Sequence, residues 1–312
     1  MRQTVLKCSK QTLERMKAHY GPYIQSKKPG ASLFFAKPPG CAVTAYLSGK
    51  VLFQGKTCET EAARWQGEST AAKKKAPTAG DTRWLPPKNL ATLSVIGSDE
   101  VGTGDYFGPM TVTAAFIASD QLKELQSVGL KDSKQLSDLQ IDALAETIKP
   151  LITYKQLTLA NRKYNELFEG GMNQGKMKAM LHNHAIRHVI HQLKEEGTPY
   201  DGILIDQFAK PGVYYNYLKG QPEIINDRVW FQTKAEGLHL SVAAASIIAR
   251  QAFVKEMDAL SEKVGMGLPK GAGAQVDAAA AQLIREQGKD VLRDVAKLHF
   301  ANTQKAFELT RQ

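Results

Sequence analysis

From Leu93 onward, the sequence alternates short apolar runs with longer segments of helical periodicity. The apolar runs predict strands over residues 92–98, 111–117, 152–159, 202–206 and 228–233. The longer segments predict helices over residues 137–148, 176–195, 241–261, 277–286 and 290–306. This alternation restricts the region to an α/β fold in which helices pack on a mixed sheet.

One predicted helix has almost no polar face. Residues 241–250 read SVAAASIIAR and are apolar nearly all round, and a helix of this kind is buried in a protein core. Glu236 lies shortly before this helix, between it and the preceding strand. We therefore expect the start of the helix to hold Glu236 close to the core.

Residues 98–109, SDEVGTGDYFGP, place two acids and then three glycines directly after an apolar run. In a regular strand Asp99 and Glu100 point to opposite faces, so both reach one site only where the strand ends or twists. Gly102, Gly104 and Gly108 permit an irregular backbone and the close approach of a ligand. A hairpin turn with solvated acids is the alternative that this segment alone leaves open.

A further apolar strand ends on Asp206, and acids at strand ends are well placed to bind cations at the edge of an α/β sheet. Together with Asp99, Glu100 and Glu236 this gives four candidate carboxylates without histidine or cysteine, a set that suits Mg²⁺ or Mn²⁺. Four acids in one site repel one another unless metal neutralises them. Two such ions can activate a water and stabilise the leaving oxygen of a phosphodiester.

The N-terminal residues 1–66 predict a small, separate α/β domain of order β-α-β-β-β-α. The predicted strands cover residues 4–7, 32–37, 42–47 and 51–54, and the predicted helices cover 10–20 and 59–66. Residues 67–90 are rich in small residues, lysine and proline, which predicts a flexible linker. The remaining residues, 91–312, form the predicted catalytic domain.

Almost all of the excess positive charge lies in the first 90 residues. They hold 16 Lys or Arg against 5 Asp or Glu, a net charge of +11, whereas the rest of the chain is at −1. Such a region attracts polyanions, and an exposed sheet face with Phe34, Tyr46 or Leu52 is a candidate surface for a nucleic-acid duplex. The alternatives are a soluble domain that happens to be basic, or a face covered by its own helices.

Several features predict a cytoplasmic protein without membrane contact, and we expect it to be a monomer. No apolar run approaches the ~18 residues of a membrane span, and the first ten residues lack the apolar core of a secretion signal. Cys8, Cys41 and Cys58 are odd in number and lack a metal-binding spacing, so we interpret them as reduced structural thiols.

Four motifs, SDEVGTGDYFGP, GLKDSKQLS, ILIDQF and TKAEGLHLSVAAASIIAR, resemble those of the ribonuclease HIII family in order and spacing. The resemblance covers the whole chain. It implies a TATA-binding-protein-like domain followed by a ribonuclease H-like catalytic domain. It also implies an endoribonuclease that uses Mg²⁺ or Mn²⁺ to hydrolyse the RNA strand of RNA–DNA hybrids, leaving 5′-phosphate and 3′-hydroxyl ends.

The resemblance also assigns the site residue by residue. The family's four metal-binding acids fall on Asp99, Glu100, Asp206 and Glu236. The related type 2 ribonuclease H family has an arginine where this chain has Thr103, usually an aspartate at the position of Glu236, and a tyrosine in the stretch that here reads VGMGL. These differences favour ribonuclease HIII and imply a preference for stretches of RNA over a single embedded ribonucleotide.

Two further groups of residues are candidates for contacting substrate. Lys131, Ser133 and Lys134 offer a hydroxyl between two ammonium groups, which suits a phosphate, although a helix-capping turn is the alternative. The resemblance implies that three backbone amides read the ribose 2′-hydroxyl. These amides belong to Gly102, Thr103 and Gly104.

The predicted helix over 176–195 carries several histidines. His184 and His188 stand at i and i+4, a spacing that can bind zinc, but no third ligand is evident in the sequence. We therefore interpret this cluster, His182, His184, His188 and His191, as solvated or core-edge side chains. The polar residues beside the start of the helix are candidates for facing the substrate: Asn173, Lys176 and Lys178.

Two other functions stay open at this point. One is a type 2-like ribonuclease that cuts at single ribonucleotides, against which Thr103 argues. The other is a non-catalytic hybrid-binding protein with a degenerate site, against which the four intact acids argue.

Overall fold

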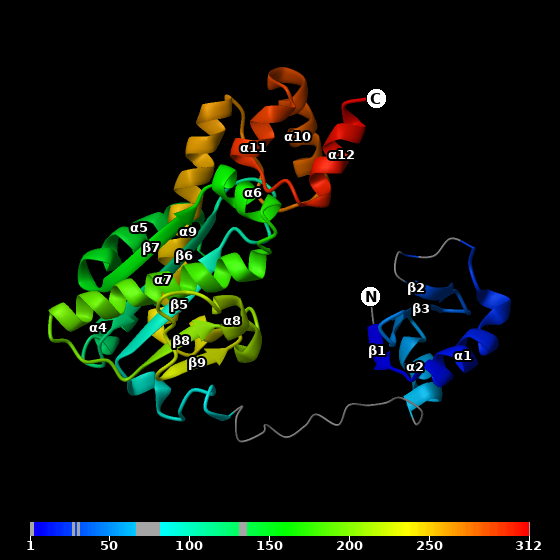
Figure 1. Cartoon of the computed structure of the whole chain (residues 1–312), viewed down its shortest axis with the longest axis horizontal. Coiled ribbons are helices and arrows are strands. Elements are labelled where there is room, and N and C mark those ends of the chain that lie inside the picture. Colours follow the sequence, from blue (N-terminus) through cyan, green and yellow to red (C-terminus); the bar gives the residue numbers. More distant parts are fainter. Residues whose placement is uncertain (1–2, 27–28, 30–31, 67–81, 131–135, 312) are drawn as a thin grey trace. The chain divides into compact units, whose positions relative to one another are not determined.

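The computed structural model describes residues 3–26, 29, 32–66, 82–130 and 136–311. The chain divides into two compact units, Met1–Thr78 and Ala79–Gln312. Figure 1 shows the elements of each unit in the colours of the sequence. Each unit has its own hydrophobic core.

The first unit is a four-stranded antiparallel sheet with two helices on one face. Helix α1 (Lys10–His19) begins after Ser9, whose side chain accepts a hydrogen bond from Thr12 N. Helix α2 (Cys58–Gln66) follows the last strand. The sheet order is β1-β4-β3-β2, and its strands are β1 (Gln3–Lys7), β2 (Ser32–Ala36), β3 (Cys41–Tyr46) and β4 (Lys50–Gly55). The predicted β-α-β-β-β-α order is confirmed.

One face of this sheet packs against the helices and the other stays open. Phe34 and Phe53 point to the helices and are 2% exposed or less. Alternation along the strands places Phe35 and Leu52 on the opposite face, where β2, β3 and β4 align them through Thr44. The prediction that Phe34 lies on the exposed face is therefore wrong, and its neighbour Phe35 lies there instead. Tyr46 and Leu52 do lie on the open face, both partly exposed.

The second unit contains a mixed sheet of five strands in the order β7-β6-β5-β8-β9. Strands β5, β6 and β7 pair antiparallel, whereas β5, β8 and β9 pair parallel. This confirms the predicted mixed sheet. The strands are β5 (Val95–Val101), β6 (Met110–Ile117), β7 (Thr153–Leu159), β8 (Gly202–Asp206) and β9 (Val229–Gln232).

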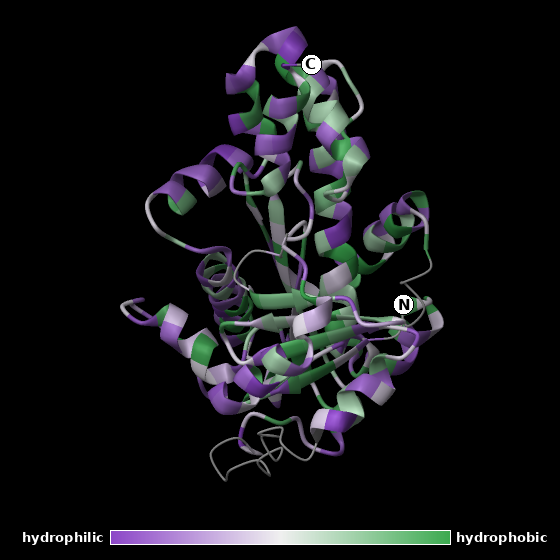
Figure 2. Ribbon diagram, turned by 90° about the vertical axis from the view of Figure 1, so that its right-hand side faces the viewer, coloured by the Kyte–Doolittle hydropathy of each residue, from purple (hydrophilic) through white to green (hydrophobic). Residues whose placement is uncertain are grey.

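Helices cover both faces of this sheet. On one face lie α7 (Gln174–Glu195) and α8 (Pro211–Leu218); on the other lie α9 (Leu240–Val264), α5 (Asp138–Ile148) and α4 (Leu122–Ser127). Figure 2 shows hydrophobic residues concentrated on the central strands. Helix α9 is buried along its first half, as its apolar sequence predicts. No helix in the described part of the chain is long and apolar enough to cross a membrane.

A second hydrophobic core lies beyond one end of the sheet, where the last helices gather (Figure 1). The elements here are α6 (Asn161–Glu169), α10 (Ala274–Gln287), α11 (Leu292–Val295) and α12 (Ala301–Leu309). The single helix predicted over 290–306 is wrong. The chain leaves helical geometry at Ala296, which is extended because it forms an antiparallel bridge with Phe107.

The predicted linker falls in two parts. Residues 67–81 lie outside the described residues. Residues 82–90 belong to the second unit, where Trp84 stacks on Tyr215 with ring centroids 4.8 Å apart. The Trp84 carbonyl also accepts a hydrogen bond from Phe231 N of β9 at 2.9 Å. This end of the predicted linker therefore packs against the sheet.

Candidate active site

The candidate acids meet where two parallel strands separate. The pairing of β5 with β8 ends at Ser98 and Ile205, while β5 continues beside β6 as far as Val101. Asp99 and Asp206 are the next residues of their strands, so their side chains lie beside the opening between β5 and β8. Strand β5 therefore continues past the acids, but its pairing with β8 ends just before them.

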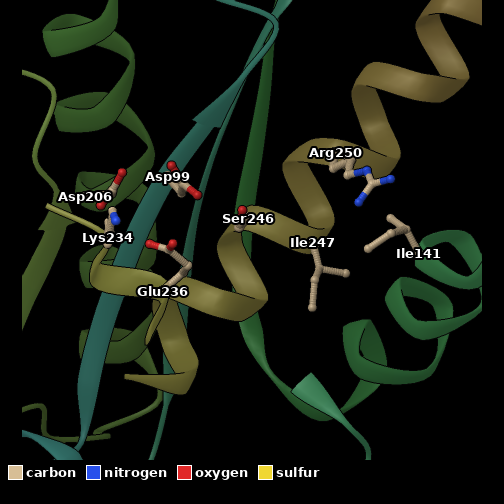
Figure 3. A pocket seen from close by; sticks show the side chains of 8 residues that line it. All are labelled: Asp99, Ile141, Asp206, Lys234, Glu236, Ser246, Ile247 and Arg250. Carbon is tan, nitrogen blue, oxygen red and sulfur yellow. The ribbon is translucent and has the colours of Figure 1, made fainter. Parts of the chain in front are cut away.

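Three of the four acids line a single pocket of about 340 Å³ on the α9 face of the sheet. Asp99 and Asp206 come from the strands, and Glu236 comes from the short 3-10 helix η5 (Ala235–Gly237) that precedes α9. The Ala235 amide donates to Asp206 Oδ1 at 2.9 Å, which ties η5 to the end of β8. In Figure 3 the three carboxylates lie at one end of the pocket. The other lining residues are Ile141, Lys234, Ser246, Ile247 and Arg250.

The fourth acid, Glu100, points toward α7 on the other face, as the alternation along β5 requires. Its carboxylate is 10% exposed and accepts two hydrogen bonds from α7. Lys178 Nζ lies 2.7 Å from Oε1, and His182 Nε2 lies 2.9 Å from Oε2. Within the described residues, no three side chains of His, Cys, Asp or Glu form a ready metal-binding group. The predicted convergence thus consists of three acids in one pocket and a fourth held beside it.

Two of the acids on the α9 face, Asp99 and Asp206, have raised pKa values. Burial raises the pKa of Asp99 to about 7, opposed by a hydrogen bond from Ser246 and reinforced by repulsion from Glu100 and Asp206. Burial also raises the pKa of Asp206, and repulsion from Glu236 and Glu100 adds to this. In Glu100, burial is outweighed by the contacts with His182 and Lys178, so its pKa is lowered.

The glycine turn after β5 is closely packed. Gly102 has φ +90°, and a Cβ there would lie 2.3 Å from the Pro109 carbonyl oxygen, so both its conformation and its contacts require glycine. The Thr103 carbonyl accepts a hydrogen bond from Gln174 Nε2 of α7 at 3.0 Å. Gly104 has no neighbour within 4 Å of a Cβ position, so this part of the turn is open to a ligand.

A fully buried lysine holds the far side of this turn. Lys297 donates from Nζ to the carbonyl oxygens of Asp105 and Gly108, and Asn161 Nδ2 donates to the same Gly108 oxygen at 2.8 Å. Burial lowers the pKa of Lys297 to about 7, against the attraction of Asp105. The segment after α11 therefore anchors the turn through both its backbone and this side chain.

The structure describes only some of the other predicted site residues. Lys131, Ser133 and Lys134 lie outside the described residues. Asn173 caps α7, since its Oδ1 accepts a hydrogen bond from Lys176 N at 2.9 Å. His184 and His188 form an exposed stacked pair with Nε2 atoms 3.0 Å apart.

The sequence does not reveal the contacts of Lys178 and His182 with Glu100. Their spacing of four residues does place them on one face of a helix. The strand residue that this face meets depends on how α7 packs across the sheet, which the spacing alone does not determine.

The second unit is a mixed sheet flanked by helices, with carboxylates at the ends of its interior strands β5 and β8. Its similarity to known proteins places it in the ribonuclease H-like class. The family model described as Ribonuclease HII matches residues 96–303, and the model described as Domain of unknown function (DUF3378) matches residues 3–78. A ribonuclease H2 structure from Pyrococcus horikoshii OT3, 22% identical over 70% of this chain and all of that one, has the same fold at a TM-score of 0.57.

Relatives that match over the full length of the chain have higher sequence identity. Ribonuclease HIII of Bacillus subtilis (strain 168) is 53% identical over 310 residues, covering 99% of this chain and 98% of that protein. The crystal structure of Bst-RNase HIII in complex with Mn²⁺ is 43% identical, with both chains covered completely and a TM-score of 0.69. The chain therefore belongs to the ribonuclease HIII family. It is a hydrolytic endoribonuclease that acts on RNA–DNA hybrids.

Proposed function

We propose that Asp99, Glu100, Asp206 and Glu236 hold divalent metal ions, Mg²⁺ or Mn²⁺, with which the chain hydrolyses the RNA strand of RNA–DNA hybrids. This proposal is supported by the meeting of Asp99, Asp206 and Glu236 in one pocket where β5 and β8 separate. Glu100 follows Asp99 directly on β5 and lies beside this pocket. Their donor atoms are all carboxylate oxygens, the ligands of hard cations.

The charge state of the pocket supports the same assignment. Asp99 and Asp206 have raised pKa values because they are buried and repel their neighbours. A divalent cation removes this repulsion and favours the ionised carboxylates. The solved relative named above, Bst-RNase HIII, was crystallised in complex with Mn²⁺.

Two bound divalent ions supply an activated water and stabilise the leaving oxygen, so that cleavage leaves 5′-phosphate and 3′-hydroxyl ends. The chain's own residues prepare the site for them. Asp99 and Asp206 present carboxylates from neighbouring strands, and the Ala235 amide fixes the orientation of Asp206. Glu236 is held at the start of the buried helix α9, so its backbone has little freedom to move.

Substrate contacts are proposed for two segments. The open backbone at Gly102, Thr103 and Gly104 is assigned to the ribose 2′-hydroxyl. Lys131, Ser133 and Lys134 are assigned to a phosphate of the hybrid. Support for the second segment comes from Arg250, which lines the pocket and donates to the carbonyl of Leu136, just beyond it, at 3.0 Å.

We further propose that residues 1–66 bind the hybrid, that residues 67–90 connect the two domains, and that residues 91–312 cut. The support is the net charge of +11 in the first 90 residues and the open sheet face. Phe35 lies on β2, and the Nζ atom of Lys37 is 5.6 Å from the centroid of its ring. An aromatic ring beside an ammonium group suits contact with sugar and phosphate.

The chain is proposed to work as a cytoplasmic monomer. Support for the compartment comes from its three cysteines, Cys8, Cys41 and Cys58, which are buried and form no disulfide in the described part of the chain. Buried thiols without disulfides are typical of a reducing compartment.

Single substitutions of the acids test the metal assignment. We expect Asp99→Asn, Glu100→Gln, Asp206→Asn and Glu236→Gln each to lower kcat on a uniform hybrid by about a hundredfold or more, because each removes a metal ligand. The assay pairs this hybrid with a duplex that contains one ribonucleotide, with and without EDTA. Circular dichroism checks that the variants are folded.

Asp120→Asn is the matched control, since Asp120 is exposed and lies outside the pocket. This variant should keep wild-type activity. Near-wild-type cleavage by folded Asp99→Asn protein contradicts the assignment.

A further inference from the structure

Both oxygens of Glu100 are already occupied, and the two donors differ in character. His182 is fully buried, whereas Lys178 is 13% exposed and ends a flexible side chain. They lie one turn apart on α7, at 2.9 and 2.7 Å from the carboxylate. A metal ion that uses Glu100 therefore meets a carboxylate that already has partners.

Ser98 holds the imidazole of His182 at the nitrogen that does not face Glu100. The Ser98 hydroxyl lies 2.6 Å from His182 Nδ1, and Ser98 is also fully buried, two residues before Glu100 on the same face of β5. A hydroxyl that donates to Nδ1 leaves the proton on Nε2, which then donates to Glu100. The Phe208 ring packs 5.2 Å from the imidazole centroid. This arrangement leaves His182 a single orientation toward Glu100.

Lys178 has an alternative partner. Its Nζ lies 4.2 Å from the centroid of the Phe208 ring, close enough for a cation–π contact. Its long side chain can therefore leave Glu100 without losing every favourable contact. In the metal-free protein its ammonium group places a positive charge where the acids otherwise repel one another.

We propose that Lys178 is a resident counter-ion that competes with the divalent cation for Glu100, while His182 is the positioning residue that keeps Glu100 oriented. The inference rests on the proposed role of Glu100 as a metal ligand. On this view Lys178 stabilises the metal-free site and weakens metal binding, so it sets the metal concentration at which the enzyme becomes active.

The test is the direct binding of Mn²⁺ to the full chain by isothermal titration calorimetry. Lys178→Met should bind Mn²⁺ about tenfold more tightly than wild type, because a cation beside the site is removed. Its Tm in EDTA should fall, and added Mn²⁺ should raise its Tm more than it raises that of wild type. Lys194→Met is the matched control, since Lys194 is exposed on the same helix, and its affinity should not change.

A second pair of variants guards against a folding defect. Lys178→Arg retains the charge and should bind Mn²⁺ with near-wild-type affinity. His182→Gln should lower kcat at saturating Mn²⁺ without tightening binding, because it disturbs orientation rather than charge. Folded Lys178→Met protein with unchanged or weaker Mn²⁺ affinity overturns the proposal, and so does a variant in which only the KM for the hybrid rises.

Glu100→Gln distinguishes the two levels of failure. If this variant binds Mn²⁺ like wild type, the metal assignment of Glu100 itself is wrong. If it loses affinity while Lys178→Met gains none, only the role of Lys178 is wrong.

Discussion

Asp99 and Glu100 are neighbours in the chain, yet the pKa values of their carboxyl groups are shifted in opposite directions. Burial keeps the pKa of Asp99 near 7, whereas His182 and Lys178 lower that of Glu100. The cause is the strand itself, which turns one side chain toward α9 and the next toward α7. Of these two proposed ligands, only Glu100 is fully ionised at neutral pH before metal arrives.

The raised pKa of Asp99 predicts how the metal-free protein responds to pH. The pKa is 3.8 for an unperturbed aspartate and about 7 for Asp99 in the folded chain. Between these two pH values the folded state therefore binds more protons than the unfolded state. Stability in EDTA should therefore fall as pH rises through this window. We expect the Tm to drop by about 5 °C between pH 5 and pH 7.

The Asp99→Asn variant is the control for this measurement, because an amide does not titrate. Its Tm in EDTA should vary less over the same range and should exceed that of wild type at pH 7. An equally steep decline in this variant assigns the effect to another group.

We expect Thr103 also to affect the choice of substrate. Threonine lacks the charged, multiply hydrogen-bonding group of the arginine that the type 2 family has at this position. We expect cleavage at a lone ribonucleotide in DNA to be at least about tenfold slower than on a uniform hybrid, since a charged hydrogen bond is missing. Parallel single-turnover assays measure both rates, and comparable rates refute the prediction.

At the scale of elements, the site depends on how closely β5 approaches α9. A Cβ on Gly97 would lie 2.3 Å from the Val242 amide nitrogen, in the backbone of the helix. Gly97→Ala should push the helix away and cost about 2 kcal/mol or more of unfolding free energy, measured in urea. Activity should fall as well, because Ser246 of α9 and Asp99 of β5 share the pocket.

The matched control for this change is Gly212→Ala. A Cβ at Gly212, in α8, meets no atom within 4 Å, and its φ is not positive. It should leave stability and activity unchanged. A similar loss in both variants argues against close packing as the cause.

The elements also show how much the sequence can predict. Apolar periodicity locates all five strands of the second unit and the buried helix α9, and the acids stand out because they follow apolar runs. The sequence does not reveal the break between α11 and α12, because the break depends on a bridge between Ala296 and Phe107, far away in the chain. The wrong face assigned to Phe34 has a similar origin. Phe34 and Phe35 are equally apolar, so only the packing of the helices decides which is buried.

At the scale of the molecule, the charge asymmetry predicts a division of labour. Removing the N-terminal domain should raise the KM for hybrids by about tenfold or more and flatten its salt dependence, because fewer phosphates are neutralised. The cut belongs after residue 78, since Trp84 packs against Tyr215 and β9. The value of kcat should stay within about twofold, because the four acids are retained.

Assays of full-length and truncated protein over a range of salt concentrations check this prediction. A truncated protein that binds hybrids as tightly as the full chain at every salt concentration contradicts the proposed role of the first domain. A large loss of kcat at unchanged KM contradicts it as well.

The anchoring of the glycine turn by Lys297 determines when the site can form during synthesis of the chain. Lys297 and the Gly108 carbonyl that it binds are 189 residues apart in the chain. During translation, the turn beside Asp99 and Glu100 emerges long before the residues that hold it. A chain still attached to the ribosome therefore carries its acids but lacks the anchored turn until Lys297 has been made and has left the ribosome.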